Sequence, residues 1–504
     1  MPLNYEMLVQ TVTMPLILMG LIFCTISPSG AAEKNALADA VVSSSDALYG
    51  KLVDRTRTPE IPGVVSPSFV VDPTWPKPLP NKWIIGQVGG IAVDQDDNIW
   101  VLHRPRSLSA TAVGALDVAA HDKDGLAIDG LGNPRPFSEK HAKCCVPAPS
   151  VLKFDASGTL LDSWGGPSDP EFLKTRCRAD QGCVWPAREH GIFVDHNNFV
   201  YLSGNGEGAE GQFPWSATHG NDSHVLKFSA TGNFIYQIGY AGTTEPSNES
   251  TNGGPGGTPQ LFMPSDMTVD PQTNRLYIAD GYGNSRVLVV DAKTGKYIGH
   301  FGAYGQNPVV TKPIGDSGAY GQDLVATKSD GAAPWPVKFR AGVTKPRYFD
   351  SAVHCAVVSR DGLVYVCDRN NNRIQVFRAD AVGKPCINAD AKTGACGFVR
   401  DIPVELQTVG PTVGGIAFST DGEQSCLYAA DLWNGMFHVI DRSNGNIVQQ
   451  VGRTGRQVGQ FNWLHSLTVD SRGNVYTGEV ETGQRVQKFT RHGSVGCSST
   501  GSAR

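Results

Sequence analysis

The sequence lacks a basic run and carries little charge. Only 18% of its 504 residues are Asp, Glu, Lys or Arg, and the formal net charge is −5. Without a basic cluster, nucleic acid and anionic membrane surfaces are poor candidates as partners. Low charge together with 58 Gly and 32 Pro is typical of a large, loop-rich all-β protein and argues against a helical or disordered chain.

The apolar segment near the start of the chain is short, and no Lys or Arg precedes it. The run from Met14 to Ile26 is too short to span a bilayer comfortably. Small residues follow at 29–32 and suit a cleavage site. We therefore predict that residues 1–32 are an export signal and that the mature protein is secreted or periplasmic, with no stable membrane insertion after cleavage. Two alternatives are a later start at Met14 and a retained segment that acts as an anchor.

No CxxC spacing occurs, which argues against a metal site built from cysteines. The chain has 11 Cys, and removing Cys24 with the export signal leaves ten, an even number in a compartment where disulfides persist. Adjacent Cys144 and Cys145 are not expected to bond each other, because neighbouring cysteines rarely do. Spacing does not reveal the partners of Cys144, Cys145, Cys355, Cys367, Cys426 and Cys497. The pairs that bracket short loops are preferred: Cys177 with Cys183, and Cys386 with Cys396.

A repeated unit organises the rest of the chain. In residues 354–377, HCAVVSRDGLVYVCDRNNNRIQVF, apolar runs at 356–358, 363–366 and 374–377 are separated by polar turns, which predicts a meander of antiparallel strands. Most copies continue into a fourth strand that ends in Gly. Four strands per unit and six units predict an all-β six-bladed β-propeller. The other five copies begin at Gly89, His190, Ser265, Gly414 and His465.

The propeller is assigned to residues 81–492. Residues 33–80 become Pro-rich and are predicted to form an extended N-terminal segment, and residues 493–504 a C-terminal tail. A strand at 68–71, or one at 83–85, would close the ring by joining the last blade.

Long excursions interrupt the repeats at 105–149, 239–260 and 302–351. Loops of this length in a compact fold are usually functional covers or disordered. We expect several of them to surround the mouth of the propeller axis.

The first residue of each copy falls on one ring around the propeller axis, because the innermost strands line that axis. His occupies this position in alternate copies, and small residues occupy the others. Three imidazoles from separate blades predict a metal site with an open fourth position, as in catalytic zinc centres. The alternative is that these His are satisfied core residues in register by chance. The ring reads, in order, Gly89, His190, Ser265, His354, Gly414, His465.

Three further residues are candidates for the same site. Arg104 and Arg369 end the second strands of their copies, where they would reach over the His ring and clamp a carboxylate. The alternative for these residues is a surface ion pair, for example between Arg369 and Asp368 or Asp350. Tyr282 lies between two glycines in the third copy, and a nearby divalent cation would favour its phenolate, which makes it a candidate general base. Packing is the alternative for Tyr282.

These residues carry a family resemblance. The chain from about Val88 to Phe489 resembles the NHL-repeat propellers and, within them, the peptidyl-α-hydroxyglycine α-amidating lyase, which releases glyoxylate and leaves a peptide amide. The most specific matches are His103-Arg104, the three ring His, DGYGNSR at 280–286, and Asp368-Arg369 followed by NRIQ at 372–375. The resemblance implies zinc on His190, His354 and His465, Tyr282 as base, and Arg104 and Arg369 at the substrate.

The chain departs from that family at several points. The sequence WLHS at 463–466 has no carboxylate where the lyase has Met-Pro-His-Asp, which argues against the structural calcium that the resemblance would otherwise imply. Gly283 and Val376 stand where the family disulfides have cysteines, and the insertion after Arg104 replaces a shorter segment. We expect no copper monooxygenase domain beside the propeller to make the hydroxyglycine, which leaves a different substrate open.

The working hypothesis is a metal-dependent lyase, with zinc as cofactor, acting on a small or peptidyl hydroxylated carboxylate. The metal would bind the substrate oxygen or a hydroxide, Tyr282 would remove the hydroxyl proton, and Arg104 or Arg369 would hold the carboxylate. A monomer is expected. The alternatives are a metal-dependent hydrolase or lactonase on the same fold, and an exported binding scaffold without catalysis.

Overall fold

The computed structural model describes residues 64–109, 112–113, 144–206, 220–243, 245–308, 348–350, 352–382, 397–406, 408 and 410–499. Every described residue belongs to one compact unit, which lies within Arg55–Arg504. The predicted export signal, the Cys386–Cys396 pair and most of the 105–149 insertion lie outside the described residues. No helix in the described ranges is long and apolar enough to cross a membrane.

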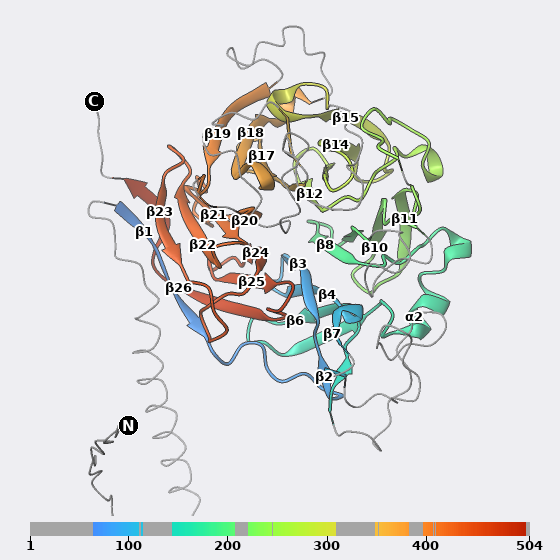
Figure 1. Ribbon diagram of the computed structural model, residues 1–504, viewed down its shortest axis with the longest axis horizontal. Helices are drawn as coiled ribbons and strands as arrows, with labels where there is room; N and C mark the ends of the chain where they lie inside the picture. Colours follow the sequence, from blue (N-terminus) through green and yellow to red (C-terminus); the bar gives the residue numbers. More distant parts are fainter. Residues whose placement is uncertain are drawn as a thin grey trace, which may run out of the picture. The chain divides into compact units, whose positions relative to one another are not determined.

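Six four-stranded antiparallel sheets confirm the prediction of an all-β six-bladed propeller (Figure 1). The first three blades follow the chain from the inside outward. Blade 1 is β3 (Gln87–Val93), β4 (Ile99–Arg104), β6 (Val151–Phe154) and β7 (Leu160–Trp164); blade 2 is β8 (Glu189–Val194), β9 (Val200–Gly204), β10 (His224–Phe228) and β11 (Phe234–Gly239); blade 3 is β12 (Asp266–Asp270), β13 (Arg275–Asp280), β14 (Arg286–Asp291) and β15 (Tyr297–Phe301).

The remaining blades repeat this order, except that the last one takes its outer strand from the N-terminal side of the propeller. Blade 4 is β16 (Val353–Val358), β17 (Leu363–Asp368), β18 (Arg373–Arg378) and β19 (Phe398–Pro403); blade 5 is β20 (Val413–Phe418), β21 (Cys426–Asp431), β22 (Met436–Asp441) and β23 (Ile447–Val451); blade 6 is β24 (Leu464–Val469), β25 (Val475–Glu479), β26 (Val486–Ser499) and β1 (Val64–Asp72).

Strand β1 closes the ring by pairing with β26, for example at Val71 with Phe489 (Figure 1). This confirms the first of the two predicted closures. The alternative segment forms β2 (Trp83–Ile84), which pairs in parallel with β5 (Val146–Pro147) outside the blades. Described strands therefore run from Val64 to Ser499, beyond both ends of the predicted 81–492 span.

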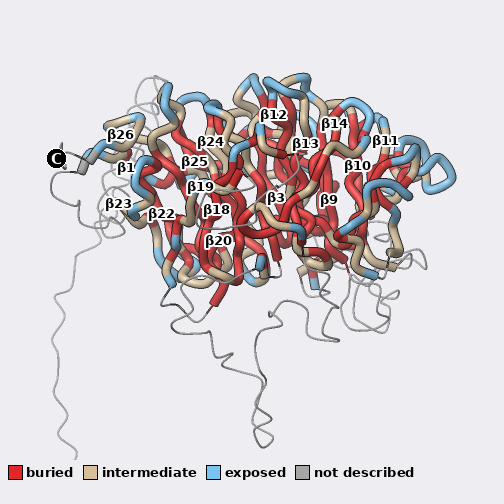
Figure 2. Tube along the Cα trace, turned by 90° about the horizontal axis from the view of Figure 1, so that it is seen from above, coloured by how far each residue is buried: buried red, intermediate tan, exposed pale blue. Residues whose placement is uncertain are grey.

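The innermost strands bring the blades together. They contact one another in cyclic order, β3, β8, β12, β16, β20, β24 and back to β3. Apolar clusters fill the spaces between adjacent blades; the cluster between blades 1 and 2, for instance, packs Trp164 against Phe172 of the short helix α2 (Pro170–Thr175). Buried residues run through the strands and exposed ones gather at the turns (Figure 2). The frame is thus rigid where it presents the ring positions.

Four disulfides lie among the described residues, which fits an extracytoplasmic location. The predicted pair Cys177–Cys183 is confirmed. The expectation that Cys144 and Cys145 do not bond each other is wrong, because a φ of 105° at Cys145 brings the adjacent side chains together. The third pair, Cys355–Cys367, joins directly opposed residues of β16 and β17.

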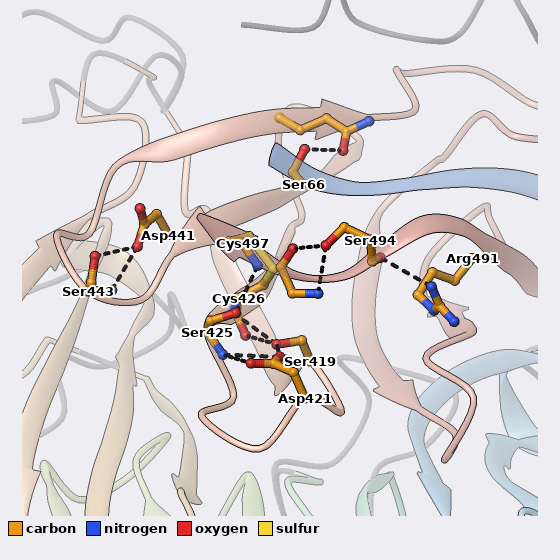
Figure 3. Close-up of a disulfide and its surroundings, with 12 residues drawn as sticks. Ser66, Ser419, Asp421, Ser425, Cys426, Asp441, Ser443, Arg491, Ser494 and Cys497 are labelled. Atoms are coloured by element: carbon orange, nitrogen blue, oxygen red, sulfur yellow. Dashed lines mark hydrogen bonds between the residues drawn. A yellow bond between two sulfur atoms is a disulfide. The ribbon is translucent and has the colours of Figure 1, made fainter. Parts of the chain in front are cut away.

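The fourth disulfide, Cys426–Cys497, ties β21 of blade 5 to β26 of blade 6 (Figure 3). The amide of Cys497 donates to Ser425 Oγ at 2.8 Å, and the amide of Ser425 donates to Asp421. Because this bond spans 71 residues, it restricts the unfolded chain more than the short Cys177–Cys183 loop does.

Candidate metal centre

Five of the six ring residues lie at β-bulges. The pairing register of the innermost strand with its neighbour shifts at each of these positions, so the ring residue stays out of the ladder. Bulges of this kind re-aim a side chain and are common beside active sites. The sixth, Ser265, directly precedes β12, and its hydroxyl contacts Ala279 O and Val353 O. The bulged residues are Gly89, His190, His354, Gly414 and His465.

The three predicted His come together. His190, His354 and His465 each offer one ring nitrogen, and these three nitrogens all lie within 4.8 Å of one another. The centroids of the three rings are 4.7 to 4.9 Å apart. All three side chains are buried.

Each of these imidazoles is oriented by the ring residue of the following blade. His190 Nδ1 lies 2.8 Å from Ser265 O, His465 Nδ1 lies 2.8 Å from Gly89 O, and His354 Nδ1 contacts Gly414 O. A carbonyl oxygen only accepts, so every Nδ1 carries the hydrogen and every Nε2 keeps its lone pair. Metal-binding His side chains typically have this arrangement, with the outer nitrogen donating to a carbonyl.

The small ring residues are required by the same geometry. A Cβ atom at position 89 would lie 2.6 Å from Glu189 O and 2.8 Å from His190 O. A Cβ atom at position 414 would clash with Leu432 and with His465 O. The alternation of large and small residues therefore follows from the close approach of neighbouring innermost strands.

The environment keeps the three imidazoles neutral. Burial lowers the pKa of each well below its ordinary value. Positive neighbours act in the same direction: Arg104 on all three, and Arg369 on His354 and His465. Neutral imidazoles with converging lone pairs are the form that binds a divalent metal, so the residues present fit a metal ion.

Tyr282 reaches the ring. Its hydroxyl lies 3.0 Å from His190 Nε2 and 3.2 Å from His354 Nε2, and it accepts a hydrogen bond of 3.0 Å from Arg369 Nη1. One hydroxyl proton serves only one of the two Nε2 lone pairs at a time. A cation shared by the three Nε2 atoms would satisfy both and leave the phenol proton available.

The turn that carries Tyr282 is fixed from behind. The amide of Tyr282 donates to Met263 O, and the buried pair of Asp280 and Arg286 holds the ends of the turn at 2.9 Å. The glycines on either side of Tyr282 are needed for space: a Cβ at Gly281 would clash with the backbone of Val353, and one at Gly283 with the Phe262 ring. The sequence predicted an inward-reaching loop; close packing is the reason for its glycines.

The two predicted arginines occupy different places. Arg369 contacts Tyr282 and Asn370, while the neighbouring carboxylate of Asp368 pairs with Arg373 at 2.7 Å. The surface ion pair of Arg369 with Asp368, the alternative reading, is therefore not what the structure contains.

Arg104 is buried beside the His190 strand. Its Nε donates to Glu189 O at 2.6 Å and its Nη1 donates to Gln87 Oε1 at 2.7 Å. Burial, with repulsion from Arg188, lowers the pKa of Arg104, and attraction from Tyr282 opposes that shift. Arg104 thus lies in the same electrostatic environment as Tyr282.

Sequence reasoning missed Arg188. It stands two residues before His190, lowers the pKa of His190 and Arg104, and lies 3.7 Å from Glu481 across the first blade. The signal was available, because aligning the copies puts Arg188 at the entrance to the ring position.

The chain is similar to known propeller proteins and amidating enzymes. An NHL repeat is recognised at residues 353–377. The peptidylglycine alpha-amidating monooxygenase of Rattus norvegicus is 26% identical over 397 residues, which cover 72% of this chain and 33% of that protein. Peptidyl-glycine alpha-amidating monooxygenase A of Xenopus laevis is 24% identical over 233 residues, covering 45% of this chain and 19% of that protein. The matched regions thus span about a fifth to a third of those relatives.

Among solved structures, one titled "Streptogramin B lyase structure" aligns with a TM-score of 0.37 and 10% identity, covering 81% of this chain and 94% of that chain.

Proposed function

We propose that this protein is a zinc-dependent lyase that acts on a small or peptidyl hydroxylated carboxylate at the His ring. The observation that carries the proposal is the set of three carbonyl-oriented imidazoles with converging Nε2 lone pairs. The distant similarity to amidating enzymes supports the same reaction class. Secretion or a periplasmic location and a monomeric state belong to this proposal.

The reaction would cleave the C–N bond of a carbon that also bears a hydroxyl group. A base removes the hydroxyl proton, the C–O bond becomes a carbonyl as the C–N bond breaks, and the departing nitrogen takes up a proton. The products are an amide and a 2-oxo acid, which is glyoxylate when the reacting carbon bears hydrogen. When bound, a metal at the His ring supplies stabilisation of negative charge on oxygen.

Tyr282 is the base in this proposal, because its hydroxyl is within 3.2 Å of two ring Nε2 atoms. Arg369 donates to the phenol oxygen and would stabilise the phenolate. The same guanidinium, or that of Arg104, would hold the substrate carboxylate. The three imidazoles stay neutral and bind without taking up the proton.

Metal analysis of the purified protein tests the proposal. We expect about one equivalent of zinc, since three His ligands and an open position make one catalytic site. His190→Ala, His354→Ala or His465→Ala should each lose most of it. Ser265→Ala, on the same ring, should keep it.

Turnover is tested with an N-acyl-α-hydroxyglycine, with glyoxylate as the measured product. Metal retained without glyoxylate release would argue for the hydrolase alternative. A triple His→Ala variant that folds and keeps a native partner would refute catalysis at the ring and favour the scaffold.

A further inference from the structure

The blades place different side chains at equivalent positions around the His ring. Asp280, Asp368, Asp431 and Glu479 each end the second strand of their blade, and the last three pair with the residue directly before a ring position. One or two residues beyond this point, blade 3 has Tyr282 and blade 4 has Arg369. At the same place, blade 5 has Leu432 and Trp433, and blade 6 has Val480.

One side of the ring is cationic. Blades 1, 2 and 4 contribute Arg104, Arg188 and Arg369: Arg104 Nε donates to Glu189 O beside His190, Arg188 stands two residues before His190, and Arg369 donates to Tyr282. Glu481 faces this group, 3.7 Å from Arg188 and 3.5 Å from the Gln87 amide. Three guanidiniums face two carboxyl groups, Glu481 and the buried Glu189, and this excess of positive charge favours an anionic group.

The opposite side is apolar. Leu432 packs so closely on the ring that no Cβ fits at Gly414, which lies between His354 and His465. The next residue, Trp433, stands at the place that Tyr282 occupies in blade 3. Trp463 stands two residues before His465, as Arg188 does before His190.

The two indoles form a pair at this side. Their ring centroids are 5.4 Å apart and their planes meet at 86°, the edge-to-face geometry that aromatic rings prefer. The amide of Val480 donates to Trp463 O at 3.1 Å, which fixes the backbone beside the ring, and Gly410 leaves room for the Trp433 indole. Leu432 and Val480 are buried, but Trp433 and Trp463 are only partly so. Large aromatic side chains left partly open beside a buried polar site are typical of ligand pockets.

From this division we infer that the substrate is a carboxylate whose reacting carbon also bears an aromatic or bulky apolar group, and that Trp433 and Trp463 bind this group. The inference rests on the proposed function for the placement of the carboxylate. It adds a specificity-determining subsite that blades 5 and 6 supply. A substrate bound this way spans the ring, with its anionic group toward Arg369 and its apolar group toward the Trp pair.

Two 2-hydroxy acids test the subsite without turnover. Mandelate and lactate have the same charge, neither has an amine to expel, and they differ in a phenyl for a methyl group. With the zinc-loaded full-length protein, titration calorimetry should give mandelate an affinity about tenfold or more above that of lactate, because the phenyl ring gains both burial and an aromatic contact.

Variants locate the preference. Trp433→Ala and Trp463→Ala should each bring the mandelate affinity close to that of lactate, and should leave lactate within about twofold of the unmodified protein because its contacts are unchanged. Trp433→Phe should keep most of the preference. Ile235→Ala, on the exposed face of β11 far along the blade from the ring, is the control and should change neither affinity.

The outcomes separate this inference from the lyase proposal. A protein that releases no glyoxylate but prefers mandelate would refute the lyase and support the subsite. An active lyase with equal affinity for the two acids would overturn the subsite alone, and so would a protein that binds neither acid. Retained preference in both Ala variants would move the subsite away from the Trp pair and overturn the inference.

Discussion

The His ring and the strand ends just outside it bury ionisable side chains in opposite ways. At the strand ends each carboxylate has a cationic or imidazole partner: Arg286 for Asp280, Arg373 for Asp368, His438 for Asp431 and Arg485 for Glu479. At the ring, the hydroxyl of Tyr282 lies against the imidazoles of His190 and His354 and the guanidinium of Arg369. Each carboxyl group of the first set thus has a side-chain partner within the chain, whereas Arg369 in the second set donates to neutral groups.

This difference separates frame from site. A buried carboxylate with a guanidinium partner needs nothing further, and it holds the turn between the second and third strands of its blade. Three converging lone pairs next to Arg104 and Arg369, whose described hydrogen bonds go to neutral groups, call for a cation and an anion from outside the chain. Arg369 and Arg373 are only four residues apart, yet Arg373 belongs to the frame through its pair with Asp368, and Arg369 belongs to the site through its contact with Tyr282.

The largest expected effect concerns the phenol at the ring. Replacing Tyr282 with Phe should leave the zinc content unchanged and lower the rate of glyoxylate release by about 10²- to 10⁴-fold, the range for loss of a general base. Single-turnover kinetics with metal analysis of the same sample measure both. Near-normal glyoxylate release would exclude Tyr282 as the general base.

The two arginines of one turn test the division between frame and site. Arg373→Met should cost about 3–5 kcal/mol of unfolding free energy, because it leaves the buried Asp368 carboxylate without its cation. Arg369→Met should cost only about 1 kcal/mol, because Arg369 loses hydrogen bonds to neutral groups. Urea unfolding of both variants gives the comparison. Equal costs would show that Arg369 is also a frame residue.

Removing the Cys426–Cys497 disulfide should lower the stability of the protein without changing metal binding at the His ring. The double variant Cys426→Ser with Cys497→Ser should lose about 2–4 kcal/mol of stability, because the unfolded chain regains the freedom of a long loop. Its zinc content should match that of the unmodified protein, since no ring ligand is touched. Loss of zinc from a folded double variant would contradict the separation. Thermal unfolding and metal analysis are the measurements.

Acid should lower the stability of the metal-free protein progressively through the ring histidines. Burial lowers the pKa of His190, His354 and His465 below their ordinary value, and it lowers the pKa of His103 to about 4. Above about pH 6.5 the folded and unfolded states are both neutral at these sites, so their full stability is present. As pH falls below that value only the unfolded state takes up protons, and stability should decline by roughly 1 kcal/mol per pH unit for each histidine.

Urea unfolding of the metal-free protein between pH 7 and pH 4 measures this decline. A variant with the three ring His replaced by Ala should show a much shallower slope, because only His103 then contributes among these four. An unchanged slope would mean that the ring does not control the acid response.

Most of the propeller blades could be predicted from the sequence because the same strand and turn pattern repeats along the chain. The alternation of short apolar runs and polar turns gave six copies, and the strands near 356–358, 363–366 and 374–377 lie within β16, β17 and β18. Ring closure by 68–71 was one of two alternatives, because β pairing between distant segments depends on geometry that local pattern does not contain. The bond between Cys144 and Cys145 was missed for a similar reason, since it depends on one unusual backbone angle.

The candidate metal centre could be predicted from the sequence only in part. Alignment of the copies placed three His on one ring, because a propeller repeats each position around its axis. It did not show that each Nδ1 donates to the carbonyl of the next blade, nor that Arg369 contacts Tyr282 while Arg373 takes Asp368. Arg188 and the Trp433–Trp463 pair were missed, because their significance lies in which blades become neighbours.

The sequence by itself determined the blade unit, the number of copies and the alternation of His with small residues, since these depend on local strand and turn chemistry and on a period along the chain. Only the tertiary structure decided which lone pairs converge, which arginines are paired, and that the ring has a cationic and an apolar side. Those properties arise between residues that are tens to hundreds of positions apart, such as His465 and Gly89. Closing the propeller is the physical step that brings them into contact.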